Sequence, residues 1–236
     1  MSKKKPALPR GSSVVCLDAM ILIGYAEADL VATLGSLFTG AGVSAYTSAW
    51  LHKHEISLPA ATYPNNNRIL AATWLETAEV VDDDILYVEN LLAAWGSEAG
   101  RDRGEAEIVA LCTRHGWTGI SDDGKAHGVP ELAEGQQRPF KPRMVHGAAL
   151  LAAAAAENLI STGDAWAAHQ AVEARYDDPP LIPIDDNYEQ AFVDAATAIR
   201  KRRDQLGAPA WPILLTHNTD AIVRAAVRRR RQQLAG

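Results

Sequence analysis

The chain has 236 residues, 47% of them hydrophobic and 22% charged, a near-average composition that excludes a globally disordered chain and a fibrous repeat. The apolar run Leu150 to Ala156, even with the two alanines before it, is far shorter than the roughly 18 residues of a membrane span, and two cysteines are too few for a disulfide framework or a structural zinc site. The segment from position 200 onward has nine basic and two acidic residues and a net charge of +7. Because the whole chain has a net charge of −6, the residues before position 200 carry −13. A polyanion would therefore have to bind a basic patch of an acidic protein.

The first twelve residues contain three lysines and two prolines but no long apolar segment with a cleavage site. We therefore expect a basic disordered tail over 1–12, no signal peptide, and a cytoplasmic protein without membrane contact.

The first third of the chain predicts a buried strand, Val14 to Leu17, which runs through Asp18 directly into a helix. Residues 43–58 mix helix formers with polar residues and end at a proline. A helix is then predicted over 68–77, and a second strand over 78–81.

The middle of the chain alternates helices with strands. Three aspartates at 82–84 suit a helix N-terminus, because carboxylates there accept hydrogen bonds from free amides and complement the helix dipole. The pattern predicts, in order, helix 84–96, helix 105–115, strand 117–121, a short helix 125–134, strand 143–145 and helix 148–157. This alternation favours a parallel sheet with helices on both faces.

The last part of the chain has a different character. Residues 176–180 include two adjacent prolines and read as a linker, and helices are predicted over 187–205 and 219–234. The sequence thus predicts a tail over 1–12, an α/β domain over 13–175 and a helical basic C-terminal extension over 176–236.

Acidic residues follow two of the predicted strands. Asp18 leaves the first strand, and Asp122 with Asp123 leaves a later one, so these carboxylates belong to the same carboxyl edge of a parallel sheet. Glu105 begins a helix about 16 Å long that leads back to the later strand, which places it near that edge as well. Carboxylates that converge without basic partners repel one another unless a cation neutralises them, and Mg²⁺ or Mn²⁺ is the natural one.

Taken in order, these motifs resemble the PIN domain, the nuclease fold known from VapC toxins. The resemblance covers residues 14–175 and rests on Val-Val-Cys-Leu-Asp at the first strand, Gly-Glu-Ala-Glu from Gly104, Thr-Gly-Ile-Ser-Asp-Asp ending at Asp123, and the late Val-His-Gly-Ala-Ala-Leu-Leu. It implies a three-layer α/β/α fold with a central, mostly parallel sheet. By the same resemblance Asp18, Glu105 and Asp122 are the catalytic, metal-binding acids, with Asp123 and Glu55 as further metal ligands.

The resemblance also implies an activity. We expect a Mg²⁺- or Mn²⁺-dependent endoribonuclease that hydrolyses RNA with a metal-activated water, and a homodimeric toxin inhibited by an antitoxin protein. The alternative is a catalytically silent PIN-like module that binds RNA or protein. In either case the C-terminal arginines are candidates for RNA phosphate contacts, namely Arg228, Arg229, Arg230 and Arg231.

Each of these residues also has a purely structural interpretation. Asp18 would cap the following helix, Glu105 would complement a helix dipole, the Asp-Asp-Gly run would form a turn, and the arginines would end a terminal helix. Glu107 lies about 200° around the helix from Glu105, so we expect it to face solvent. His52 and His54 cannot share a zinc ion on a helix, and His146 and His169 are expected to pack or be solvated.

Overall fold

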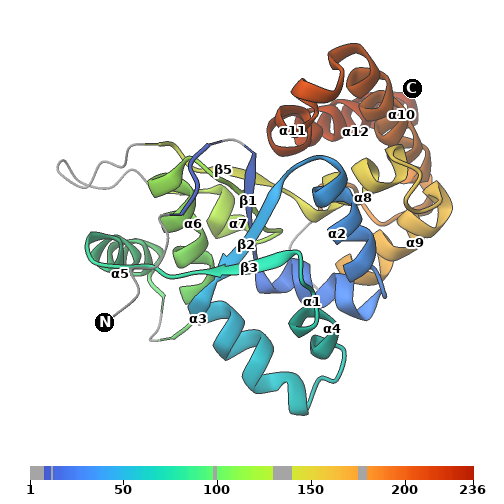
Figure 1. The fold of residues 1–236 in the computed structure, drawn as a ribbon. Coiled ribbons are helices and arrows are strands. Elements are labelled where there is room, and N and C mark those ends of the chain that lie inside the picture. The colour runs from blue at the N-terminus through green and yellow to red at the C-terminus, as the bar shows by residue number, and fades with distance from the viewer. Residues whose placement is uncertain (1–7, 12, 98–99, 130–139, 175–179) are drawn as a thin grey trace.

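The computed structural model describes residues 8–11, 13–97, 100–129, 140–174 and 180–236. A five-stranded sheet forms its centre, with all neighbouring strands parallel and in the order β3-β2-β1-β4-β5 (Figure 1). The strands are β1 (Val14–Leu17), β2 (Ser44–Ser48), β3 (Leu75–Ala78), β4 (Thr118–Ile120) and β5 (Arg143–Val145). The chain adds strands on one side of β1 and then on the other, so the strand order reverses between β1 and β4. In open parallel sheets this reversal opens a crevice at the carboxyl ends of the strands.

Helices lie on both faces of the sheet. On one face are α1 (Ala19–Glu27), α2 (Val31–Gly40) and α8 (Gly147–Ala156), and on the other are α5 (Asp83–Trp95) and α6 (Arg103–His115) (Figure 1). All four residues of β1 are buried, as a central strand covered on both faces requires. The predicted α/β class with a parallel sheet is confirmed, and the layers are consistent with a three-layer α/β/α arrangement.

Two predicted elements differ from the structure near the start of the chain. The expected single element over 43–58 divides into β2, α3 (Ala49–Leu51), a π-helical turn η1 (His52–Ser57) and a 3₁₀ turn η2 (Leu58–Ala61). The expected helix over 68–77 is short α4 (Asn66–Leu70), and β3 begins three residues earlier than predicted. In both places pairing with a neighbouring strand overrides local propensity, since Ala45 to Ser48 pair with Leu75 to Ala78.

The remaining helices of the α/β part follow the predictions more closely. The helices predicted over 84–96, 105–115 and 148–157 correspond to α5, α6 and α8, each within two residues at either end. The short helix predicted over 125–134 is α7 (Gly124–His127) in the described part, and its second half lies outside the described residues. Helix α9 (Thr162–Glu173) was not predicted, although Ser161 caps it by accepting a 3.1 Å hydrogen bond from Asp164 N.

The C-terminal segment packs against the α/β part. It contains η3 (Asp186–Tyr188), α10 (Glu189–Leu206), η4 (Ala208–Ala210), α11 (Trp211–Ile213), η5 (Leu214–Asn218) and α12 (Thr219–Ala235). Helices α10 and α12 pack on α8, and η5 packs on edge strand β5. Buried Phe192 and Ile199 of α10 belong to the same hydrophobic cluster as α8 and β1. The predicted boundary at 175/176 and most of the predicted linker lie outside the described residues, as does most of the 1–12 tail.

Helix α8 shows how closely the segments pack. All ten of its residues are buried, seven of them alanines, because the sheet side, α9, α10 and α12 leave no solvent-facing stripe. Small side chains let the helices around it approach closely.

No single helix among the described residues is long and apolar enough to cross a membrane. Only α1 and α2 taken together reach that length and composition, and they are bent by 119° relative to each other.

Candidate functional site

Asp18 lies at the carboxyl end of β1, at the point where the strand order reverses. Its side chain is almost fully buried, with 1% exposed. The hydroxyl of Ser121 donates a 2.8 Å hydrogen bond to Oδ2, and Oδ1 is buried without a hydrogen-bond partner among the described residues. Although Asp18 precedes α1, its carboxylate makes no capping hydrogen bond to that helix beyond an interaction with the adjacent amide of Ala19, which lowers the pKa of Asp18. The helix-cap interpretation therefore does not account for this residue.

Three further carboxylates lie close enough to Asp18, or to one another, for their charges to interact. Glu105 stands in the first turn of α6, and Glu55 on η1 brings Oε1 to within 2.8 Å of where a Cβ on Gly104 would lie. Burial raises the pKa of Asp18, and the nearby charges of Glu55 and Asp123 raise it further. Burial also raises the pKa of Glu105, with Asp18 and Asp123 adding to the effect. We call Asp18, Glu55, Glu105 and Asp123 the acid cluster.

The acid cluster is not neutralised by basic side chains. Burial, followed by repulsion from Glu105 and Glu107, raises the pKa of Glu55 to about 7. Within the described part of the chain, no lysine, arginine or histidine forms an ion pair with any of the four carboxylates. Elevated carboxyl pKa values in a crevice are typical of functional sites, because a core that needed only stability would avoid such repulsion.

Two neighbouring cations, Lys125 and Arg103, are paired with acids outside the acid cluster. Lys125 Nζ lies 2.5 Å from Oδ2 of Asp102, just before α6. Burial would raise the pKa of Asp102, but hydrogen bonds from Lys125 and Ser97 outweigh it and lower the value. Arg103 is held by Glu89 and Glu107, at 3.2 Å from each.

The structure separates the adjacent pair Asp122 and Asp123. Asp123 contributes to the field at Asp18 and Glu105, while its Oδ1 also accepts a 2.6 Å hydrogen bond from Lys125 N and so caps α7. Asp122 turns toward α8, where its Oδ1 accepts a 2.8 Å hydrogen bond from the amide of Gly147. Burial raises the pKa of Asp122, and its charge acts on Glu173 behind it. By its charge, Asp123 is therefore the member of the pair that acts on Asp18 and Glu105, whereas Asp122, which the sequence favoured, bonds to α8.

Glu107 does not face solvent as predicted, since only 4% of it is exposed. Helix α6 is buried around most of its circumference, so the face away from Glu105 is covered as well. Burial raises the pKa of Glu107, and a hydrogen bond with Ser48 and one from Arg103 act in the opposite direction.

A second polar group lies at the end of β5. Oδ1 of Asp220, on α12, accepts hydrogen bonds of 3.0 Å from both the amide and Nδ1 of His146. The ring of His127 stacks on His146, with centroids 3.8 Å apart. Sequence reasoning missed this group, because Asp220 and His146 are separated by 74 residues. His169 is buried, as expected, and bonds through Nε2 to the carbonyl of Ile182 at 2.8 Å.

The predicted arginine cluster lies on α12. Arg228, Arg229 and Arg231 are exposed, whereas Arg230 donates a 2.7 Å hydrogen bond to the carbonyl of Asn187. Three of the four side chains are therefore accessible to a ligand from solvent.

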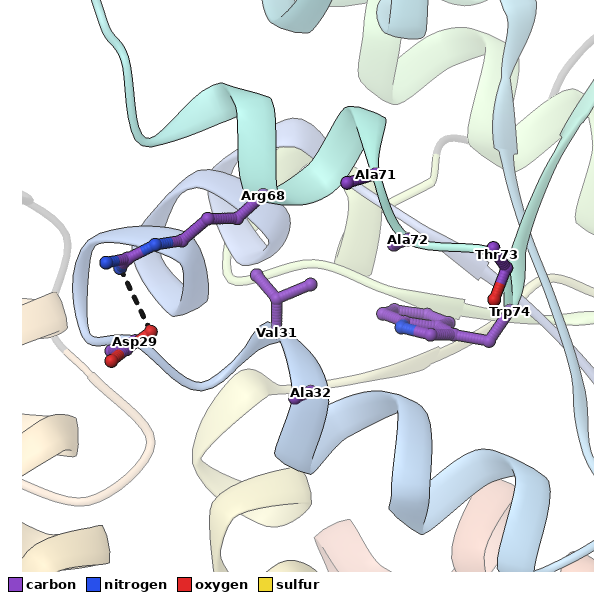
Figure 2. A pocket seen from close by; sticks show the side chains of 8 residues that line it. All are labelled: Asp29, Val31, Ala32, Arg68, Ala71, Ala72, Thr73 and Trp74. Carbon is purple, nitrogen blue, oxygen red and sulfur yellow. Dashed lines mark ion pairs between the residues drawn. The ribbon is translucent and has the colours of Figure 1, made fainter.

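A pocket of about 320 Å³ lies away from the acid cluster. It is bordered by the turn between α1 and α2, by α4, and by Thr73 and Trp74 just before β3 (Figure 2). Arg68 and Asp29 form a 3.2 Å ion pair across one end of it. Because it precedes β3, this pocket is at the amino side of the strand and contains none of the predicted site residues.

The acid cluster matches the chemistry of a hard divalent cation. Carboxylate oxygens are the ligands that Mg²⁺ and Mn²⁺ prefer, and Asp18 Oδ1 is a buried oxygen in need of a partner. As the side chains stand, no three His, Cys, Asp or Glu residues of the described ranges are gathered tightly enough to hold a metal ion.

No known protein family, curated protein or solved structure matches the chain.

Proposed function

We propose that this protein is a Mg²⁺- or Mn²⁺-dependent endoribonuclease of the PIN type. Asp18, Glu105 and Asp123 would hold the metal, with Glu55 in support, and Asp122 would position the adjoining end of α8. The observation that carries the proposal is the acid cluster, in which Asp18 is buried and the other three acids are partly buried; it lies at the reversal point of a parallel sheet and has no ion-pair partner among the described residues. Such a cluster is unfavourable in a folded protein unless a cation occupies it.

The chain's own groups prepare this place for a cation. Ser121 fixes one oxygen of Asp18 and leaves the buried Oδ1 available. Glu55 has a pKa of about 7 without metal, so at neutral pH its carboxyl group exchanges a proton readily and is suited to take one up. A bound metal would lower the pKa of a water molecule and neutralise charge on the phosphate and the leaving oxygen.

The toxin role and the partners are further parts of the proposal. The resemblance to VapC supports a toxin that acts as a homodimer and is inhibited by an antitoxin. The exposed arginines of α12 supply a basic patch for the RNA backbone on an otherwise acidic protein.

The proposal is tested with the purified full chain and a panel of single-stranded RNAs, incubated in EDTA, Mg²⁺ or Mn²⁺. Cleavage is expected with Mn²⁺ or Mg²⁺ only, and Asp18→Asn should abolish it. The matched control is Glu189→Gln, which removes an exposed carboxylate from the first turn of α10 and should cleave like the wild type. If no RNA is cut under any condition, the catalytically silent PIN-like module becomes the better description.

A further inference from the structure

Two aromatic rings stack beside the acid cluster. Trp50 and His54 stand four residues apart on the helical turns that follow β2, and their ring centroids are 4.8 Å apart with planes inclined by 28°. Arg103 places its guanidinium carbon 5.9 Å from the centroid of the Trp50 ring. Arginine, tryptophan and histidine thus form one group of flat side chains.

This group is anchored at one end and open at the other. Trp50 is partly buried and packs against the hydrophobic core, and Arg103 is fixed by Glu89 and Glu107. His54, by contrast, is exposed. A flat ring that lay against His54 would extend a stack whose other members are already immobilised, so it would meet little cost in ordering side chains.

The stack adjoins the acid cluster on the side of Glu55 and Glu107. His54 immediately precedes Glu55, whose carboxylate lies against Gly104. Arg103 bonds to Glu107 at 3.2 Å, and Glu107 is close enough to Glu55 for its charge to raise the pKa of Glu55. A polymer whose phosphate lay at the acid cluster would therefore have its neighbouring groups beside the stack.

We infer that Trp50, His54 and Arg103 form a subsite for one nucleobase of a single-stranded RNA, next to the phosphodiester that is cut. This inference rests on the proposed function and names its substrate class. Aromatic side chains and arginine bind unpaired bases by stacking, with little dependence on sequence. A base held in a duplex is stacked on its neighbours and cannot reach the rings, so the subsite selects single strands.

The test measures RNA binding in EDTA, where a metal-dependent enzyme does not cut. Fluorescence anisotropy of a labelled single-stranded RNA is compared for the wild type, His54→Ala, Trp50→Leu and Trp50→Phe. Removal of one stacking ring is expected to weaken binding about 5- to 150-fold, whereas Trp50→Phe, which keeps a ring, should retain most of the affinity. Phe140→Leu is the matched control, because Phe140 is an exposed aromatic at the opposite end of α6, beside Gly116.

A second measurement shows whether the rings contact a base. A set of RNAs is made in which a single abasic nucleotide occupies a different position in each. The wild type should bind one of these RNAs with the same reduced affinity that His54→Ala shows for intact RNA. That abasic RNA should bind His54→Ala no more weakly than it binds the wild type, since the base that the ring would touch is already missing. Because His54 is exposed, its replacement is not expected to unfold the protein, and thermal melts check this.

The outcomes separate the two proposals. If RNA binds to His54→Ala and to Trp50→Leu with the same affinity as to the wild type, the base subsite is overturned and the nuclease proposal still stands. The base subsite is also overturned if the loss of affinity caused by His54→Ala adds in full to the loss caused by each abasic nucleotide, at every position. The ring would then act without touching a base. If the wild type neither binds nor cuts any single-stranded RNA, both the nuclease proposal and the base subsite are rejected.

Discussion

Ser121 donates a 2.8 Å hydrogen bond from its hydroxyl to Oδ2 of Asp18 and so ties the end of β4 to the end of β1. The oxygen of this hydroxyl also accepts a 3.1 Å hydrogen bond from the amide of Asp123. One small side chain therefore sets the positions of two members of the acid cluster, on the two strands between which the order reverses.

The first prediction is that Ser121→Ala weakens Mn²⁺ binding and moves its pH dependence upward. The Ser121 hydrogen bond lowers the pKa of Asp18 against the effect of burial, so its removal should raise that pKa further. Titration calorimetry with Mn²⁺ between pH 6 and pH 8 measures the change. Ser161→Ala, which removes a helix cap from α9 and costs about 1 kcal/mol of stability, should leave Mn²⁺ affinity unchanged.

The second prediction distinguishes Asp123 from Asp122. Mn²⁺ at a hundredfold excess over its dissociation constant should stabilise the wild type by about 2.7 kcal/mol. Asp18→Asn and Asp123→Asn should lose most of this effect, whereas Asp122→Asn should keep it, because Asp122 bonds to Gly147 of α8. Thermal melts with EDTA and with Mn²⁺ provide the measurement. Equal metal shifts in Asp123→Asn and the wild type would remove Asp123 from the site.

The third prediction concerns the stability of the metal-free protein. Burial raises the pKa of Glu55 to about 7, from about 4.3 in an unfolded chain. The folded state then binds more protons than the unfolded state between these values, so stability present below pH 4 is lost as the pH rises toward 7. The melting temperature in EDTA should fall across this range by less in Glu55→Gln than in the wild type. If the melting temperature falls equally in both proteins, the pKa of Glu55 in the folded protein is not raised and this prediction is wrong.

The fourth prediction concerns α12. Replacement of Arg228, Arg229 and Arg231 by glutamine should weaken RNA binding for all sequences and flatten its salt dependence by about 0.7 in logarithmic slope for each phosphate that is no longer bound. Arg230→Gln should instead mainly affect stability, because Arg230 bonds to the carbonyl of Asn187. Binding isotherms at several salt concentrations check both effects. Unchanged binding by the triple variant would assign these arginines to another partner.

Much of the fold was predictable because strongly periodic segments and helix-end signals agree with it. Asp82 to Asp84 mark the start of α5, and Gly116 ends α6 in a left-handed conformation with φ of 73°. Strand β3 was misplaced because its conformation comes from pairing with β2, which a local pattern does not contain.

The candidate site was predictable in part for similar reasons. A parallel sheet places the ends of β1 and β4 together whatever the side chains do, which is why the sequence could place Asp18 and the Asp122-Asp123 pair at one edge. Which member of that pair faces Asp18 depends on local geometry beyond the end of β4, and the bond from Gly147 to Asp122 decides it. The burial of Glu107 could not be predicted in this way. Its position around the helix shows which way the side chain points, but it does not show whether another part of the protein packs on that side.

The complete burial of α8 bears on how this protein tolerates truncation. A fragment that stopped at residue 175 would lack α10 and α12 and expose one side of a helix made of glycine, alanine and leucine, with no polar residue to make it soluble. Such a fragment is expected to aggregate during expression even if its sheet forms. The same burial restricts sequence change in evolution, since a residue larger than alanine at most positions of α8 would push a neighbouring helix aside.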